Sequence, residues 1–257
     1  MNKIKILAIE TSGKICSIAL CSFENSKDNN FINAKNFEII SEYNCFQNNN
    51  YDKLCAELCR RILSDNNLNV EELDAIAISI GPGSFTGLRI GLSVCKGLCF
   101  YEPYQTEINF SPKMIAVPTL NAIANNIQYF FQNEYNEFSV FNKKINSYDF
   151  LSIIYSHRDL VYWQLFDVQA NPKSEIILES IDNLKKKIKN KNISIISSNS
   201  LINLDFGCYF PFLTTLTAVS IARVASLLYV ENKFANPNEL KPLYMQNFIL
   251  NKSNNIS

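Results

Sequence analysis

The sequence predicts an α/β protein built from two lobes, each a mixed sheet flanked by helices. Each half of the chain begins with strand patterns and ends with helical periodicity, which is the order of elements in a layered α/β design. The 257 residues are 47% hydrophobic and 19% charged, a composition that suits one large globular domain or two small ones. We therefore assign residues 1–104 to an N-terminal lobe and residues 105–257 to a C-terminal lobe.

The N-terminal lobe is expected to start with three strands. Apolar residues then recur every three or four positions, as on one face of a helix. An isoleucine-rich run without charge after Asp74 predicts a central strand, because strands buried on both faces are continuously apolar. The expected bounds are strands at 4–9, 15–23 and 37–45, a helix at 51–63, a strand at 73–80 and a helix from about 87 to 100.

The C-terminal lobe is expected to contain a β-hairpin between helical segments. Thr119 is placed to cap a helix, and residues 156–159 separate two strand patterns as a hairpin turn. The polar stretches 101–112 and 133–148 are interpreted as a linker and an insertion. The expected elements are strands at 114–117, 150–155, 160–167, 176–178 and 193–197, with helices at 120–129, 184–190 and 218–230.

Charge and cysteine usage exclude several classes of protein. The 24 basic and 24 acidic residues cancel, so there is no general attraction to nucleic acid or to a membrane surface. No apolar run reaches the length of about 18–20 residues that spans a bilayer, and the first residues pass directly into a strand pattern rather than a signal peptide. The eight cysteines include no Cys-x-x-Cys pair, which favours packing thiols in a reducing cytoplasm over zinc ligands.

Glycine is scarce but concentrated in one place. Five of the seven glycines lie between Gly81 and Gly97, where the sequence passes from a strand through Gly-Pro-Gly into a helix that Ser84 or Thr86 can cap. Such a turn directs backbone N–H groups and a helix N-terminus at one point, which makes an anion site an alternative. The spacing matches neither a Walker A loop nor Gly-x-Gly-x-x-Gly, so we favour a steric role.

The steric role points to a protein–protein surface. Gly87, Gly91 and Cys95 lie four apart and form a face of small side chains, which lets a second helix approach closely. The helix is apolar nearly all round, as is the helix at 51–63, so we expect both to dock on another subunit. Arg89 is expected to make a charged contact across this interface. The expected interface residues are Tyr51, Leu54, Cys55, Leu58, Ile62, Gly87, Leu88, Arg89, Gly91, Leu92 and Cys95.

Residues for catalysis are sparse. His157 is the only histidine, so neither a histidine-based triad nor a two-histidine metal site can be assembled. Glu10, Thr11 and Ser12 follow a buried strand and precede a second one, which is the plan of the phosphate-binding hairpin in actin and sugar kinases. These three residues are therefore candidates for weak nucleotide binding, although no second acidic motif accompanies them. No metal and no tightly held cofactor is expected.

Three stretches resemble a known family. They are ILAIETS at 6–12, CSIAL at 16–20 and GPGSFTGLRIGL at 81–92, with weaker matches at 117–120, 158–162 and 240–244. Together they closely resemble the TsaB family, also called YeaZ, of tRNA threonylcarbamoyladenosine biosynthesis. The resemblance implies a two-lobed actin-like (ASKHA, ribonuclease H-like) fold. The hairpin tip Ser156-His157-Arg158 and the insertion at 133–148 depart from the family pattern.

The resemblance also implies a function and partners. Family members are cytoplasmic, non-catalytic scaffold subunits that work with the catalytic subunit TsaD and the ATPase TsaE. The complex installs threonylcarbamoyl on adenosine in the anticodon loop of tRNAs reading ANN codons. The two N-lobe helices would bind TsaD or a second copy of the chain, tRNA would be contacted through the complex, and no membrane would be involved. Gly91→Leu or Leu58→Asp is then expected to abolish co-purification with a TsaD-like protein while leaving the fold largely intact.

Two alternatives belong to other classes of protein. In the first alternative, the chain would be an actin-fold enzyme, either a small-molecule kinase or a glycoprotease-like peptidase. In the second alternative, it would bind nucleotide without turnover. Phosphoryl transfer or proteolysis by the purified chain, lost on changing Glu10 or Thr11, would favour the first alternative.

Overall fold

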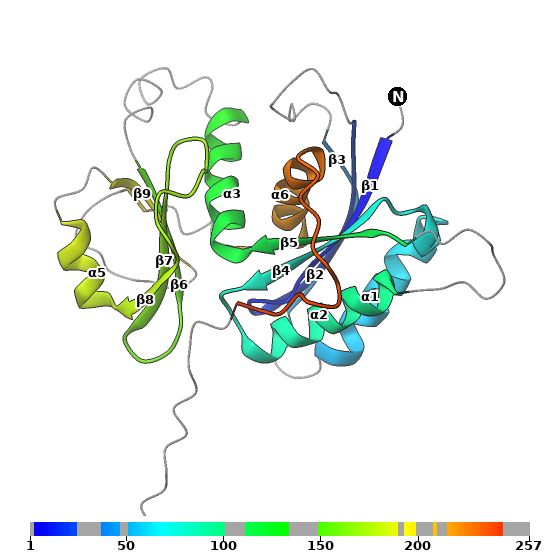
Figure 1. Ribbon diagram of the computed structural model, residues 1–257, viewed down its shortest axis with the longest axis horizontal. Helices are drawn as coiled ribbons and strands as arrows, with labels where there is room; N and C mark the ends of the chain where they lie inside the picture. Colours follow the sequence, from blue (N-terminus) through cyan, green and yellow to red (C-terminus); the bar gives the residue numbers. More distant parts are fainter. Residues whose placement is uncertain are drawn as a thin grey trace, which may run out of the picture.

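A computed structural model describes residues 3–24, 37–46, 51–100, 111–133, 149–189, 193–198, 208–209 and 215–243. Two five-stranded sheets stand on either side of a pair of helices (Figure 1). These helices are α3 (Thr119–Asn133), which packs on the second sheet, and α6 (Ala218–Val230), which packs on the first. Because α3 and α6 also contact each other, they join the two lobes.

The first sheet has the strand order β3-β2-β1-β4-β5. Its first three strands form an antiparallel meander, whereas β4 runs parallel to both β1 and β5. Every residue of β4 is buried, as expected for a central parallel strand and as its continuous apolar run predicts. The bounds are β1 (Lys3–Glu10), β2 (Ile15–Glu24), β3 (Glu38–Phe46), β4 (Ala75–Gly81) and β5 (Lys113–Pro118).

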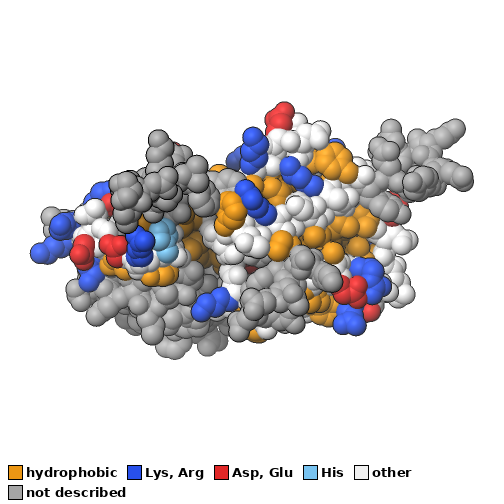
Figure 2. Space-filling model, turned by 90° about the horizontal axis from the view of Figure 1, so that it is seen from below, with side chains coloured by type: hydrophobic (Ala, Val, Ile, Leu, Met, Phe, Trp, Pro, Cys, Tyr) orange, Lys and Arg blue, Asp and Glu red, His pale blue; other side chains and the backbone are white. Residues whose placement is uncertain are grey.

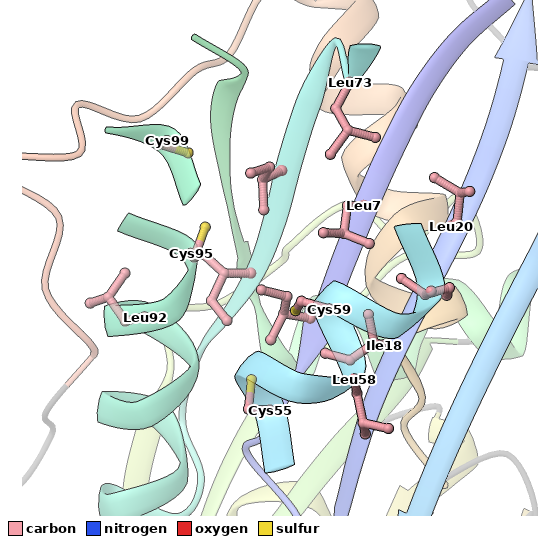
Figure 3. Close-up of a cluster of buried hydrophobic side chains, with 14 of the residues drawn as sticks. Leu7, Ile18, Leu20, Cys55, Leu58, Cys59, Leu73, Leu92, Cys95 and Cys99 are labelled. Atoms are coloured by element: carbon pink, nitrogen blue, oxygen red, sulfur yellow. The ribbon is translucent and has the colours of Figure 1, made fainter. Parts of the chain in front are cut away.

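Helices cover both faces of the first sheet. On one face α1 (Tyr51–Asp65) and α2 (Phe85–Cys99) contact each other and enclose an apolar core, part of which Figure 3 shows. A short 3₁₀ helix, η2 (Val70–Glu72), joins α1 to β4. On the opposite face α6 covers β1, β2, β4 and β5 with a second apolar core. The sheet is therefore the middle layer of a three-layer lobe.

The second sheet has the order β10-β9-β6-β7-β8, with a β-hairpin of β6 and β7 at its centre. One face packs on α3 and the other on α5 (Ile181–Ile188), the short lysine-rich helix. The bounds are β6 (Asp149–Tyr155), β7 (Leu160–Phe166), β8 (Ile177–Ser180), β9 (Ile193–Ser198) and β10 (Cys208–Tyr209).

The lobe boundary expected between residues 104 and 105 has to be corrected. β5 lies beyond that boundary and still belongs to the first sheet, and α6 returns from the C-terminal part of the chain to cover the same sheet. The N–H of Ala218 at the start of α6 donates to Oγ of Ser17 in β2 at 2.7 Å. Long-range packing of this kind leaves no local signal in the sequence.

The element predictions are otherwise confirmed, with shifted ends. α5 begins at Ile181, three residues before the expected start, because Oγ of Ser180 accepts the N–H of Asn183 and caps it. β10 was not expected from the sequence. The linker at 101–112 and the insertion at 133–148 lie almost wholly outside the described residues.

Candidate functional site

The turn between β1 and β2 holds a buried carboxyl group. Glu10 ends β1 with 1% of its surface exposed, and its Oε1 accepts hydrogen bonds from the N–H and the hydroxyl of Ser12, both at 2.5 Å. Burial raises the pKa of Glu10, and the hydrogen bonds from Ser12 partly offset that rise. Its Oε2 is buried beside the buried hydroxyl of Ser79, which also offsets part of the rise in the pKa of Glu10. The fold therefore favours the neutral form of this carboxyl group.

Three glycines bring the start of α2 against the same turn. A Cβ atom added at Gly83 would lie 2.5 Å from the carbonyl oxygen of Ser12. One added at Gly87 would lie 2.0 Å from the carbonyl oxygen of Thr11, and one added at Gly91 would lie 2.3 Å from Oγ1 of Thr11. Real Cβ contacts are never this short, so the absence of side chains is what permits the contact.

Hydrogen bonds fix this contact between the turn and α2. Oγ1 of Thr11 donates to the carbonyl oxygen of Gly87 at 2.8 Å, and the N–H of Ser84 donates to the carbonyl oxygen of Ser12 at 2.7 Å. Oγ of Ser84 also accepts the N–H of Gly87 at 3.2 Å, which confirms Ser84 as the cap of α2. The turn, the loop and the helix start are thus one interlocked unit.

Gly81 must be glycine for a different reason, its backbone conformation. Its φ of +103° belongs to the region that side-chain-bearing residues rarely adopt, and a Cβ atom there would lie 2.9 Å from Cδ1 of Leu88. The preceding residue of β4, Ile80, accepts the N–H of Leu243 through its carbonyl oxygen at 2.8 Å. The described part of the weak match at 240–244 therefore ends beside the glycine loop, where Leu243 contacts Ile80 and Gly81.

This packing bears on two expectations about the glycine loop. The backbone of Ser12 lies where a Cβ atom at Gly83 would be, so this glycine has a steric role, and an anion site at the loop stays an alternative. The face made by Gly87 and Gly91 meets Thr11 of the same chain and not a helix of another subunit. The hydroxyls of Thr11 and Ser12 are both engaged inside the chain, and weak nucleotide binding by this turn stays a prediction.

The structure places most of the expected interface residues inside the chain. Leu88 and Gly91 lie under the loop and the turn, and five further residues belong to the core between the sheet and the two helices. Arg89 is exposed and Leu54 half-buried, while the side chain of Tyr51 lies outside the described set. Gly91→Leu and Leu58→Asp would therefore damage the fold, contrary to expectation. The five core residues are Cys55, Leu58, Ile62, Leu92 and Cys95.

The outward surface of α2 carries Arg89, which was among the expected interface residues, and aromatic residues that were not. The guanidinium carbon of Arg89 lies 3.9 Å from the ring centre of Phe85, a cation–π contact on the first turns of the helix. Phe100, the residue after the helix, is 52% exposed, and Ile90, Val94 and Leu98 are half-buried. Figure 2 views the molecule from this side and shows hydrophobic side chains scattered across the lobe that carries α1 and α2. Aromatic and arginine side chains of this kind are enriched in protein interfaces.

Groups for catalysis do not converge in the described structure. His157 is exposed at the tip of the β6–β7 hairpin, where its Nδ1 lies 3.0 Å from Oγ of Ser156. Over the described ranges, no three cysteine, histidine or acidic side chains are arranged to hold a metal ion. In the same part of the chain, none of the helices has the length and hydrophobicity to cross a membrane.

Comparison with known proteins assigns the fold and the family. A family model described as TsaD, tRNA N6-adenosine threonylcarbamoyltransferase, matches residues 47–227, which is well over half of the chain. A crystal structure of a protein from Pseudomonas aeruginosa, described as similar to peptidase YeaZ, superposes with a TM-score of 0.67 at 16% identity. It covers 95% of this chain and all of that one.

Curated relatives of the chain include TsaB proteins from several bacteria. The tRNA threonylcarbamoyladenosine biosynthesis protein TsaB of Haemophilus influenzae is 23% identical over 257 residues, covering 96% of this chain and 95% of the relative. The protein of the same name from Buchnera aphidicola subsp. Baizongia pistaciae is 30% identical over 158 residues, covering 62% of this chain and 56% of the relative. The two sheets with their shared helices define a two-lobed protein of the actin-like class. Within that class, the chain belongs to the family that the TsaD model describes. Inside this family it is a member of the TsaB (YeaZ) group.

Proposed function

We propose that this chain is a non-catalytic subunit in the biosynthesis of threonylcarbamoyladenosine in tRNA. The observation that carries the proposal is its relation to TsaB proteins along nearly its whole length. The non-catalytic part of the proposal is what the resemblance to the TsaB family implies. Catalysis would then belong to a TsaD-like subunit, with a TsaE-like ATPase supplying nucleotide hydrolysis and tRNA held by the complex.

The outer surface of α2 is the docking face in this proposal. Its support is the exposed Phe100 and the Arg89–Phe85 pair, because surfaces that combine aromatic and arginine side chains suit binding to another protein. The glycine contacts on the inner side hold α2 rigidly in place, which reduces the entropy lost when a partner binds. The same face would serve a homodimer, so a dimer and the complex would compete.

Reconstitution tests the proposed function. Transfer RNA would be incubated with the TsaD-like and TsaE-like proteins of the same organism, ATP, threonine and the enzyme that makes the threonylcarbamoyl donor, with and without this chain. Modified adenosine should form only when the chain is present. The proposal fails if formation is equal without it, or if the purified chain alone transfers phosphoryl groups or cleaves peptides.

Charge reversal tests the docking face separately. Arg89→Glu and Phe100→Ser should each weaken co-purification with the TsaD-like protein by on the order of tenfold or more, because each removes a side chain typical of interface hot spots. Lys186→Glu is the matched control, since Lys186 is an exposed cation on α5 in the other lobe. Undiminished binding by both variants would place the docking face elsewhere while leaving the proposed function intact.

A further inference from the structure

Cysteine thiols gather on one side of the first sheet. Five fully buried ones belong to the core between the sheet and the helices α1 and α2, and Cys45 of β3 packs against that core while remaining half-buried. Figure 3 shows the pairs on α1 and α2. Cys21 differs, because it lies in the core on the opposite side of the sheet. The five buried thiols are Cys16, Cys55, Cys59, Cys95 and Cys99.

Cys16 and Cys45 are direct partners across two strands. β2 and β3 are antiparallel, and their register places Cys16 opposite Cys45. Residues directly opposite in an antiparallel pair have Cα atoms about 4.5 to 5.5 Å apart and side chains on the same face. Disulfides need Cα atoms about 4.4 to 6.8 Å apart. Among the strand registers of the described chain, this is the one position at which two cysteines face each other.

The two thiols differ in their access to solvent. β3 is one of the two edge strands of the first sheet, and Cys45 lies one residue from its end. Cys16 has no exposed surface, and its pKa is raised by the hydrogen bond to the Cys55 thiol and by burial. Cys16 is therefore kept as a neutral thiol, and a reagent from solution meets Cys45 first.

We propose that Cys45 and Cys16 form a modification site that reacts with small disulfides of the glutathione class. The Cys45 thiolate attacks one sulfur of the oxidised reagent, so a protein–glutathione bond forms and one glutathione thiolate leaves. The sulfur of Cys16 then attacks the sulfur of Cys45 as the Cys16 thiol gives up its proton, the mixed disulfide breaks and a second glutathione thiolate leaves. Two protein thiols are oxidised to one disulfide and one glutathione disulfide is reduced, and the two protons of the protein thiols end on the two glutathione thiolates.

The helical cysteine pairs are poorer candidates for the first reaction. Cys55 and Cys59 on α1, and Cys95 and Cys99 on α2, are each four residues apart but have at most 3% of their surface exposed. Thiol–disulfide exchange requires access to the attacking sulfur, which these residues lack in the folded chain. The cross-strand pair is the one in which an accessible thiol sits beside a buried resolving thiol.

Peptide mapping tests the proposal on the folded full chain. The protein would be treated with glutathione disulfide, alkylated and digested with trypsin. The expected product joins the peptide 15–27, which carries Cys16 and Cys21, to the peptide 36–53, which carries Cys45. Cys21→Ala is the matched control, because Cys21 lies on the other face of β2 opposite Ile39, and this variant should still form the cross-link.

Two further variants separate the steps. Cys16→Ala should retain glutathione on Cys45 and form no cross-link, whereas Cys45→Ser should carry no glutathione on the peptide 15–27. The proposal is overturned if Cys45 of the native chain stays fully alkylated at glutathione disulfide concentrations that oxidise free cysteine. It is equally overturned if the helical cysteines react first, or if the cross-link uses Cys21. Should Cys16→Ala fail to fold, the native chain and Cys45→Ser still decide the result.

Discussion

Thr11 and Gly87 are 76 positions apart in the sequence and are in contact in the fold. Oγ1 of Thr11 donates to the carbonyl oxygen of Gly87 at 2.8 Å, while the carbonyl oxygen of Thr11 occupies the place where a side chain at Gly87 would begin. The first hairpin and the first turn of α2 are thereby held as one piece.

A methyl group at position 87 should destabilise the protein, and the same change ten residues later should not. Gly87→Ala places Cβ against backbone at 2.0 Å and should lower the free energy of unfolding by about 1–3 kcal/mol, the usual cost of overpacking. Gly97 lies exposed on the same helix with nothing within 4 Å of its Cβ position, so Gly97→Ala should raise stability by about 0.5–1 kcal/mol. Urea titrations followed by circular dichroism compare the two; equal effects would refute the packing argument.

Thr11→Val, which removes the hydroxyl, should lower the free energy of unfolding less than Gly87→Ala does. Thr11→Val keeps the shape but loses the donor to the Gly87 carbonyl, which should lower the free energy of unfolding by about 0.5–1.5 kcal/mol. Thr11→Ser keeps the donor and serves as the control. In chemical denaturation the wild type should be the most stable, the Ser variant next and the Val variant the least stable. A Val variant as stable as the wild type would show that the hydrogen bond contributes nothing.

Glu10 should make the wild type lose stability as the pH rises. Its folded pKa is raised above the ordinary value of 4.5 because the carboxyl is buried, so the folded chain holds a proton that the unfolded chain releases. The contribution is fully present below pH 4.5 and is lost as the pH rises through the folded pKa. Glu10→Gln keeps an acceptor for Ser12 and lacks this titration, so its stability relative to wild type should increase across that range.

A control with the opposite sign accompanies the Glu10 experiment. The pKa of Glu38 is lowered by its hydrogen bond and ion pair with Lys3, so its contribution is present above pH 4.5 and lost as the pH falls. Glu38→Gln should therefore lose stability relative to wild type at neutral pH and not in acid. A difference between Glu10→Gln and wild type that stays constant with pH, measured by thermal unfolding, would contradict the assignment of a raised pKa to Glu10.

Glu179 links three elements of the C-terminal lobe. Its Oε1 accepts Nε1–H of Trp163 at 2.7 Å, and its Oε2 pairs with Nζ of Lys187 at 2.7 Å. Glu179→Ala leaves the indole donor of Trp163 without its partner and should cost about 1–3 kcal/mol. Glu179→Gln keeps an acceptor and should cost less than about 1 kcal/mol, because Lys187 is half-exposed. Fluorescence of Trp163, the only tryptophan, reports the unfolding directly.

Local patterns predicted the elements well, and tertiary contacts were predicted poorly. β4 and α6 were predicted from their apolar residues, because residues that are buried in the fold are apolar at almost every position of these two elements. The glycines at 87 and 91 were recognised as steric requirements, but their neighbour was taken to be another subunit. Nothing at Thr11 itself signals that its partner lies at Gly87, because contacts so distant in sequence depend on the whole fold. Arg89 on the outer side of α2 was expected, whereas Phe85 and Phe100 were not, because in a helix that is apolar nearly all round the sequence does not distinguish core positions from surface positions.

The return of α6 to the first sheet has a consequence for how the protein is made. The ribosome releases β1 and β2 long before α6, which supplies the apolar layer that covers them. At about 5–20 residues per second, the interval between residues 24 and 230 is roughly 10–40 seconds. During that time Ile6, Ala8 and Cys21 lack their covering helix, so the nascent hairpin presents an apolar surface to the cell. A chaperone that binds nascent chains would therefore be expected to protect this hairpin until residue 230 has emerged.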